Sequence, residues 1–192
     1  MVCAHVITQR DRSHPILAQC LASLEQWAWP YQIFPAVQNP SPAQWRDIAV
    51  TILTDRGKLQ YRPGAQGCWL SHFTLWSQCT QQNTPMIILE HDVVIQDRWD
   101  PTIESESDLI KLYKTARCKT NTITGQWSIG AHAYYLTPEN AQRLITHARH
   151  HGAQALDKHL GDLVVPWRFW SDDLVLLNPR RGASTTSPLR YH

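Results

Sequence analysis

The chain has 192 residues, and its 43% hydrophobic and 18% charged residues are typical of a globular protein and exclude global disorder. Eighteen basic and sixteen acidic side chains leave a formal net charge of +2, which does not favour nucleic acid or a membrane surface as a partner. At about 150 residues per domain, this length predicts a single domain over residues 1–192.

Short apolar runs alternate with helical stretches in the first half of the chain. The predicted elements are, in order, a strand over 2–8, a helix over 11–27, a strand over 31–37, and helices over 43–53 and 67–80. The last helix is the clearest, because its apolar positions recur at steps of three and four residues. The run Pro85-Met-Ile-Ile-Leu89 is unbroken and apolar, which is typical of a central parallel strand buried on both faces.

In the second half, strands are expected over 109–112, 128–137, 163–170 and 174–177, and a helix over 138–150. Pro138 lies in the first turn of that helix, where proline is favoured. The tail from residue 180 is expected to be irregular. The alternation of strands and helices predicts an α/β layered fold with a mainly parallel sheet.

The cysteines indicate a reducing compartment. The chain has five, an odd number, and none of them forms a C-x-x-C pair, which argues against a disulfide framework or a zinc finger. The first residues are too few and too polar for a signal peptide, and no apolar run reaches the ~18 residues of a membrane span. We therefore expect a cytoplasmic protein with no transmembrane segment.

The strongest local signal for chemistry is Glu90-His91-Asp92, directly after the apolar strand. In open α/β sheets, ligands bind beyond the carboxyl ends of the strands. Glu90 and Asp92 are two positions apart, so on an extended chain they point the same way and could hold Mn²⁺ or Mg²⁺. Such a cation could neutralise a diphosphate leaving group. The alternative is a polar strand end that caps a neighbouring helix.

Two other groups of polar residues allow two interpretations each. His147, His150 and His151 have the spacing of a metal-binding helix face, but imidazolium also suits the end of a helix. Asp172 and Asp173 lie in an expected turn and are either turn residues or site carboxylates. The motifs of dinucleotide oxidoreductases, P-loop ATPases, α/β hydrolases and zinc proteases are absent from the sequence.

Two neighbouring segments carry a family resemblance. Gly67-Cys68-Trp-Leu-Ser71-His72, followed by the apolar strand and its acidic end, resembles glycosyltransferase family 25. That family includes bacterial lipopolysaccharide and lipooligosaccharide galactosyltransferases and is related to collagen galactosyltransferases. Its pattern is a G-C-x-x-S-H helix, a short gap, and a strand ending in Glu-Asp-Asp. Residues 31–37, 128–144 and Asp157 are also similar to it, so the resemblance covers most of the chain.

The chain departs from this pattern in two ways. His91 stands where the family has an aspartate, which lowers the negative charge of the site by one. Its imidazole could ligate Mn²⁺ or point into the core. The segment after Val93 and the carboxyl end are also short for the family, which affects the region expected to bind the acceptor.

The resemblance implies a GT-A fold, a nucleotide-binding α/β sandwich with a mainly parallel central sheet. It also implies a UDP-sugar donor, Mn²⁺ or Mg²⁺, and inverting transfer of galactose or a similar hexose. The acceptor would be a hydroxyl of a glycan, a lipid-linked glycan such as lipooligosaccharide, or a protein. Glu90 and Asp92 would hold the metal, with His91 as a further candidate ligand.

The remaining site residues follow from the same resemblance. Asp157 is the first candidate for the general base, with Asp172 or Asp173 next; its alternative role is to cap a short helix over 158–163. Three residues after the first strand are candidates for nucleotide contact, with an ordinary solvated turn as the alternative; they are Thr8, Arg10 and Arg12. His72 either orients the site or packs its helix against the sheet.

Two functional hypotheses from different classes result. The first is an active glycosyltransferase, favoured by Glu90, Asp92 and Asp157. The second is a catalytically degenerate member that acts as a nucleotide-sugar or glycan binding or scaffold protein, favoured by His91 and the short chain. The near-neutral charge argues against a third class, nucleic-acid binding.

Overall fold

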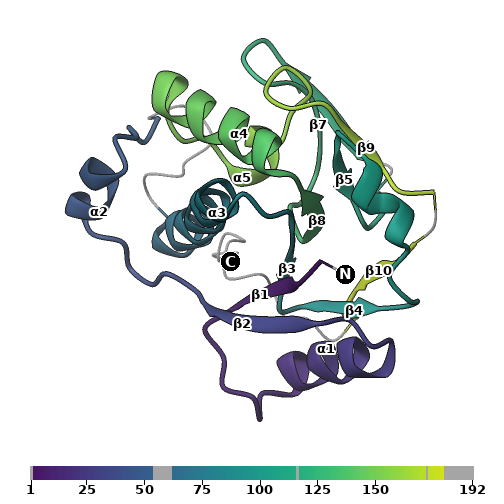
Figure 1. Cartoon of the computed structure of the whole chain (residues 1–192). Helices are drawn as coiled ribbons and strands as arrows, with labels where there is room; N and C mark the ends of the chain where they lie inside the picture. The colour runs from purple at the N-terminus through teal and green to yellow at the C-terminus, as the bar shows by residue number, and fades with distance from the viewer. Residues whose placement is uncertain (1, 54–61, 116, 172, 180–192) are drawn as a thin grey trace, which may run out of the picture.

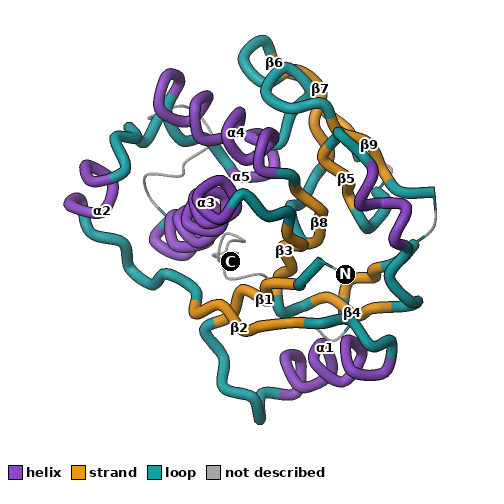
Figure 2. The backbone as a smooth tube through the Cα atoms, in the orientation of Figure 1, coloured by secondary structure: helices purple, strands orange, loops and turns teal. Residues whose placement is uncertain are grey.

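A computed structural model describes residues 2–53, 62–115, 117–171 and 173–179. Among these residues, a six-stranded sheet has the strand order β2-β1-β3-β8-β5-β9 (Figures 1 and 2). The strands are β1 (Ala4–Thr8), β2 (Tyr31–Pro35), β3 (Met86–Glu90), β8 (Ala133–Leu136), β5 (Leu109–Lys111) and β9 (Trp167–Phe169). Only β8 runs antiparallel to its neighbours in this sheet. The prediction of a mainly parallel α/β fold is therefore confirmed, and the arrangement is compatible with a GT-A-like sandwich.

Helices cover both faces of the sheet. Helix α1 (Pro15–Gln26) packs on one face, and α3 (Pro63–Gln82) and α4 (Pro138–His151) pack on the other (Figure 1). Along β3, Ile87 and Leu89 belong to the core under α1, whereas Ile88 belongs to the core under α3 and α4. This alternation explains the unbroken apolar run, because a strand buried on both faces needs apolar side chains at every position.

The other elements are short. They are α2 (Pro42–Asp47), α5 (Leu156–His159), a 3-10 helix (Pro101–Ser105), β4 (Val93–Ile95), β6 (Cys118–Asn121), β7 (Gly125–Ser128) and β10 (Val175–Leu177). Strand β10 pairs with β4, and β6 pairs with β7 in a hairpin that leaves Cys118 exposed. None of the described helices combines the length and the apolar character needed to cross a membrane.

Several sequence predictions need correction. Within the segment 128–137, only Ser128 belongs to β7 and only residues 133–136 form β8; the loop between them contains Gly130 with φ 92°, a conformation that favours glycine. Strand β3 has a parallel neighbour on one side only, because β8 on its other side is antiparallel. The helix expected over 43–53 ends at Asp47, and β4 and β6 were not predicted. The tail from residue 180 lies outside the described residues.

Candidate functional site

The candidate site lies at the edge of the sheet where the parallel strands end. Strands β1, β3 and β5 end there at Thr8, Glu90 and Lys111, and the antiparallel β8 begins there after His132. The backbone N–H of Glu90 donates to the carbonyl of His132 across a distance of 2.8 Å. The reversed direction of β8 therefore places His132, which is more than forty positions downstream of Glu90, directly beside the acidic end of β3.

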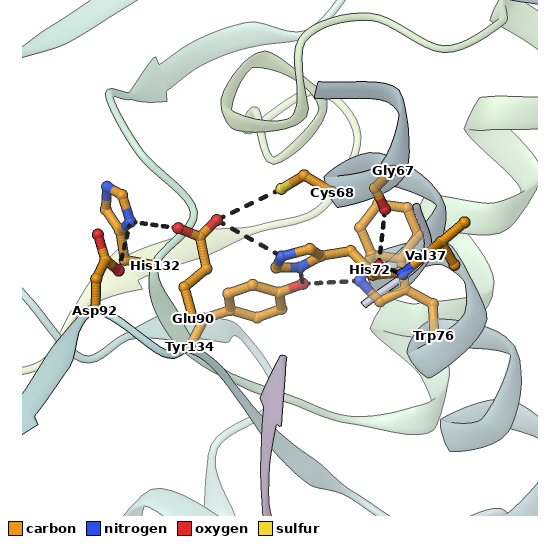
Figure 3. Close-up of polar contacts among 10 residues, drawn as sticks. Val37, Gly67, Cys68, His72, Trp76, Glu90, Asp92, His132 and Tyr134 are labelled. Atoms are coloured by element: carbon orange, nitrogen blue, oxygen red, sulfur yellow. Dashed lines mark hydrogen bonds and ion pairs between the residues drawn. The ribbon is translucent and has the colours of Figure 1, made fainter. Parts of the chain in front are cut away.

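Three side chains converge at this edge, and we call Glu90, Asp92 and His132 the acidic edge site (Figure 3). His132 Nδ1 lies 2.7 Å from Glu90 Oε2 and 3.7 Å from Asp92 Oδ1. The side chains of Glu90, Asp92 and His132 are 23%, 14% and 18% exposed, so solvent or a ligand can reach them. Glu90 and Asp92 thus converge on one imidazole, but through a turn at residues 91 and 92 rather than along the extended chain that was expected.

Helix α3 supports Glu90 from the other side (Figure 3). The Cys68 thiol donates to Glu90 Oε1 at 3.5 Å, and His72 Nε2 lies 3.9 Å from the same oxygen. The Tyr134 hydroxyl accepts from Trp76 Nε1 at 2.9 Å and lies 2.6 Å from His72 Nδ1. The hydroxyl accepts from the indole and still has its own proton to donate; when that proton goes to Nδ1, neutral His72 carries its proton on Nε2, on the side of Glu90.

The charges of this group follow from burial and pairing. Burial alone would raise the pKa of Glu90, but the charge and hydrogen bond of His132, together with the charge of His72 and the hydrogen bond from Cys68, outweigh burial and bring that pKa to about 2. Burial lowers the pKa of His72 to about 4, against the opposing effect of Glu90. Glu90 is therefore ionised and His72 neutral at neutral pH, so the contact between them is not an ion pair.

The segment Gly67-Cys68-Trp-Leu-Ser71-His72 fixes this geometry. A Cβ on Gly67 would lie 2.2 Å from the carbonyl oxygen of Val37, so only glycine allows α3 to approach the chain after β2 this closely. Ser71 Oγ accepts from the Val37 N–H at 2.8 Å and donates to the Gly67 carbonyl at 2.7 Å. Gly67 and Ser71 position the helix, and Cys68 and His72 then reach Glu90. His72 is fully buried under the sheet and also lies beside Glu90, and whether it orients the site stays a prediction.

The acidic edge site has a donor set that fits a divalent metal ion. One ligand atom from each of Glu90, Asp92 and His132 lies within 4.8 Å of the others, and carboxylate oxygens with one imidazole suit Mn²⁺. Cys68, His72 and Glu90 form a second such group. Burial raises the pKa of the Cys68 thiol well above its usual value, with added contributions from nearby carboxylates, and a protonated thiol is a poor metal ligand.

His91 lies outside both groups of candidate ligands found among the described residues. Its backbone N–H donates to the carbonyl of Ile7 at 3.2 Å and so continues the pairing of β3 with β1. Burial lowers the pKa of His91, the carboxylates of Asp92 and Glu90 oppose this shift, and Arg10 adds to it. Among the described residues, the structure thus groups His132, and not His91, with Glu90 and Asp92.

Asp157 is close enough to Cys68, which contacts Glu90, to act on it electrostatically. It is in the first turn of α5, whose N-cap is Ala155, so the interpretation of Asp157 as a helix cap is wrong. Burial is the main cause that raises the pKa of Cys68, and Asp157 adds to this rise together with Glu90 and Asp92. All three carboxylates therefore act on one thiol.

Asp157 also acts on a buried lysine at the same edge. Lys111 is 1% exposed, donates to Ser128 Oγ at 2.5 Å and lies 4.5 Å from the Trp167 ring centroid. Burial lowers the pKa of Lys111 to about 8, and the negative charge of Asp157 opposes this shift. The two side chains are thus close enough to interact electrostatically.

The remaining predicted site residues are more dispersed. Thr8 Oγ1 accepts from the backbone N–H of Arg10 at 2.9 Å, and the charge of Arg10 reaches His91, so this turn adjoins the acidic edge site. The hydrogen bond to Glu25 raises the pKa of Tyr31, and Arg12 opposes this rise, which places Arg12 beside the first residue of β2. Two carboxylates complete the set: Asp173 is exposed in the loop before β10, and Asp172 lies outside the described residues.

His132 and Lys111 were not predicted as site residues. His132 lies within a segment that reads as one long strand, and only the turn at Gly130 and the reversed pairing of β8 bring it beside Glu90. Lys111 follows a short apolar run, where a lysine is normally solvent-exposed. A signal for His132 was available in the sequence, since Gly130 interrupts that strand pattern and marks a change of direction.

The free energy of unfolding is expected to fall as the pH drops from about 6.5 to about 4, because His72 stays neutral in the folded state and takes up a proton when unfolded. The slope is at most about 1.4 kcal/mol per pH unit for each such histidine. His72→Gln cannot titrate and should give a shallower slope in urea denaturation series over this range. His150→Gln, at an exposed position, is the control and should keep the slope of the wild type. Equal slopes for His72→Gln and the wild type would contradict this assignment.

The comparison with known families bears on the central part of this site. Residues 7–125 match the model of glycosyltransferase family 25, described as an LPS biosynthesis protein. The matched segment includes the acidic end of β3 and the helix that supports it, whereas His132 and Asp157 lie beyond its end. No curated protein matches the chain.

Proposed function

Because the chain belongs to glycosyltransferase family 25, we propose that it transfers a hexose, such as galactose, from a UDP-sugar to a hydroxyl of a glycan acceptor. The family makes the protein a glycosyltransferase of LPS biosynthesis, which requires a sugar donor and a glycan acceptor. The observation that carries the finer proposal is the acidic edge site, with Glu90, Asp92 and His132 at the carboxyl edge of a mainly parallel sheet. Ligands of open α/β sheets bind at this edge.

The acidic edge site would hold Mn²⁺ or Mg²⁺ through Glu90, Asp92 and His132. When bound, the ion supplies positive charge for the departing diphosphate. Glu90, with a pKa of about 2, is ionised at neutral pH, as a carboxylate ligand must be. The nearby turn at Thr8 and Arg10 offers a hydroxyl and a guanidinium for the nucleotide.

The proposed transfer is a single displacement with inversion. The acceptor oxygen forms a bond to the anomeric carbon as the bond from that carbon to the diphosphate oxygen breaks. The proton of the acceptor hydroxyl goes to Asp157, which belongs to a different element from the proposed metal ligands and so keeps its basicity.

A donor screen tests this proposal. Thermal-shift titrations with UDP-, GDP- and CMP-sugars, each with Mn²⁺ and with EDTA, are expected to show stabilisation by a UDP-sugar with Mn²⁺ only. Release of UDP in the presence of Mn²⁺ would then establish turnover. Binding without any UDP release, with a panel of glycan acceptors present, would instead support the degenerate binding protein. Stabilisation by a GDP- or CMP-sugar alone would contradict the proposed donor.

A further inference from the structure

A second group of imidazoles lies where α4 meets α5, and it shares no residue with the acidic edge site. His147 and His151 are four residues apart at the end of α4, with ring centroids separated by 4.5 Å. His159, on α5, places its ring 5.1 Å from that of His147. We call these three residues the imidazole cluster. Residues four apart on a helix share one face, so His147 and His151 both project toward one region.

The nitrogen atoms of this cluster have unmet bonding capacity. His159 is fully buried, and its Nε2 lies 3.0 Å from the Leu144 carbonyl oxygen, to which it can only donate. The proton is therefore on Nε2, and the lone pair is on Nδ1. That Nδ1 and the Nε2 of His147 are both buried and have no hydrogen-bond partner among the residues that the structure describes. Leaving such an atom unsatisfied costs about 1–3 kcal/mol.

This is the arrangement that a metal-binding histidine requires. Imidazoles that bind metals commonly donate their other N–H to a backbone carbonyl, which fixes the tautomer and orients the ring. Burial lowers the pKa of both His147 and His159 to about 4, so both are neutral ligands at neutral pH. Trp69 and Trp76 hold the ring of His159 in place, and the exposed position of His151 gives an ion a path of entry.

We propose that His147, His151 and His159 bind a divalent transition-metal ion, with Zn²⁺ as the ion that suits them best. Three imidazoles with one open position are an established ligand set for Zn²⁺. In the structure these three imidazoles do not each bring a nitrogen within 4.8 Å of the other two, so binding requires the exposed ring of His151 to rotate and complete the set. The ion would tie the end of α4 to α5, the short helix that also carries Asp157. This site differs in chemistry from the acidic edge site, whose carboxylates favour Mn²⁺ or Mg²⁺.

Isothermal titration with Zn²⁺ tests the proposal without reference to catalysis. The titration is done on the full chain carrying Asp92→Asn, because this substitution weakens the acidic edge site, which would otherwise compete for Zn²⁺. One saturable Zn²⁺ site per chain is expected. His151→Ala and His159→Phe, each added to Asp92→Asn, should weaken the affinity roughly 10-fold or more, because each removes one ligand.

Two choices keep this test interpretable. Phenylalanine at position 159 retains an aromatic ring beside Trp69 and Trp76, and circular dichroism checks that this variant is folded. His151 is exposed, so its replacement by alanine should not disturb folding. His150→Ala, also at the exposed end of α4, is the matched control and should leave the affinity unchanged. The absence of saturable binding would overturn the proposal. If adding His159→Phe leaves the Zn²⁺ affinity equal to that of the Asp92→Asn parent, the proposal is also overturned, because Zn²⁺ would then bind only a pair of histidines on α4.

Discussion

Replacing Asp157 by asparagine is expected to lower turnover by roughly 10²-fold or more while donor binding stays intact. The substitution removes the proton acceptor that we propose for the acceptor hydroxyl. It keeps the shape of the side chain and an oxygen that can accept from the backbone N–H of Lys158, as Oδ1 of Asp157 does at 3.0 Å. The measurement is UDP release at saturating donor, together with donor affinity by isothermal titration.

A matched substitution separates this effect from a general change in charge. Asp47→Asn alters an exposed carboxylate at the end of α2, and its turnover should equal that of the wild type. Near-normal turnover in Asp157→Asn would move the role of base to Asp172 or Asp173. A loss of donor affinity in step with turnover would instead place Asp157 in donor binding.

Asp92→Ala is expected to remove most of the binding of a UDP-sugar in the presence of Mn²⁺. It deletes one of the three ligands of the proposed metal site but leaves the contacts of Glu90 with Cys68 and His132 intact. Isothermal titration should show the affinity of the variant with Mn²⁺ falling to that of the wild type in EDTA, at least 10-fold below the wild type with Mn²⁺.

The control for this prediction is Asp97→Ala, a nearby exposed carboxylate that should not affect donor affinity. If the wild type binds the donor equally well in EDTA and in Mn²⁺, the proposed metal site has no part in donor binding. In that case the positive charge that meets the diphosphate must come from side chains, and Arg10 would be the first residue to examine.

The sequence predicted the parts of the site that are local in the chain. The position of Glu90 and Asp92 at the end of β3 was predicted because an apolar strand, its end and the two carboxylates are all visible within eight residues, whereas their role as metal ligands stays a prediction. The helix that carries Cys68 and His72 was also predicted, because its periodicity is local. Its contact with Glu90 was not predicted, since it depends on the close approach of Gly67 to Val37.

The parts of the site that could not be predicted depend on contacts between segments that are far apart in the sequence. His132 joins Glu90 only because β8 runs antiparallel between β3 and β5, and no pattern within the strand itself specifies the direction of its neighbours. Asp157 was chosen from a family resemblance, and its approach to Lys111 depends on how α5 packs. The burial of Lys111 overrides the usual preference of lysine for the surface.

The hairpin of β6 and β7 carries an exposed thiol, Cys118, that can be labelled beside the candidate site. Cys118 is exposed, whereas burial raises the pKa of Cys20 and Cys79 to about 12 and that of Cys68 well above its usual value. A maleimide reagent near neutral pH should therefore react with Cys118 in preference to these three thiols. In the register of the hairpin, Cys118 lies opposite Ser128, whose hydroxyl holds Lys111. A fluorophore attached at Cys118 would thus be positioned to report optically on events at this edge of the sheet.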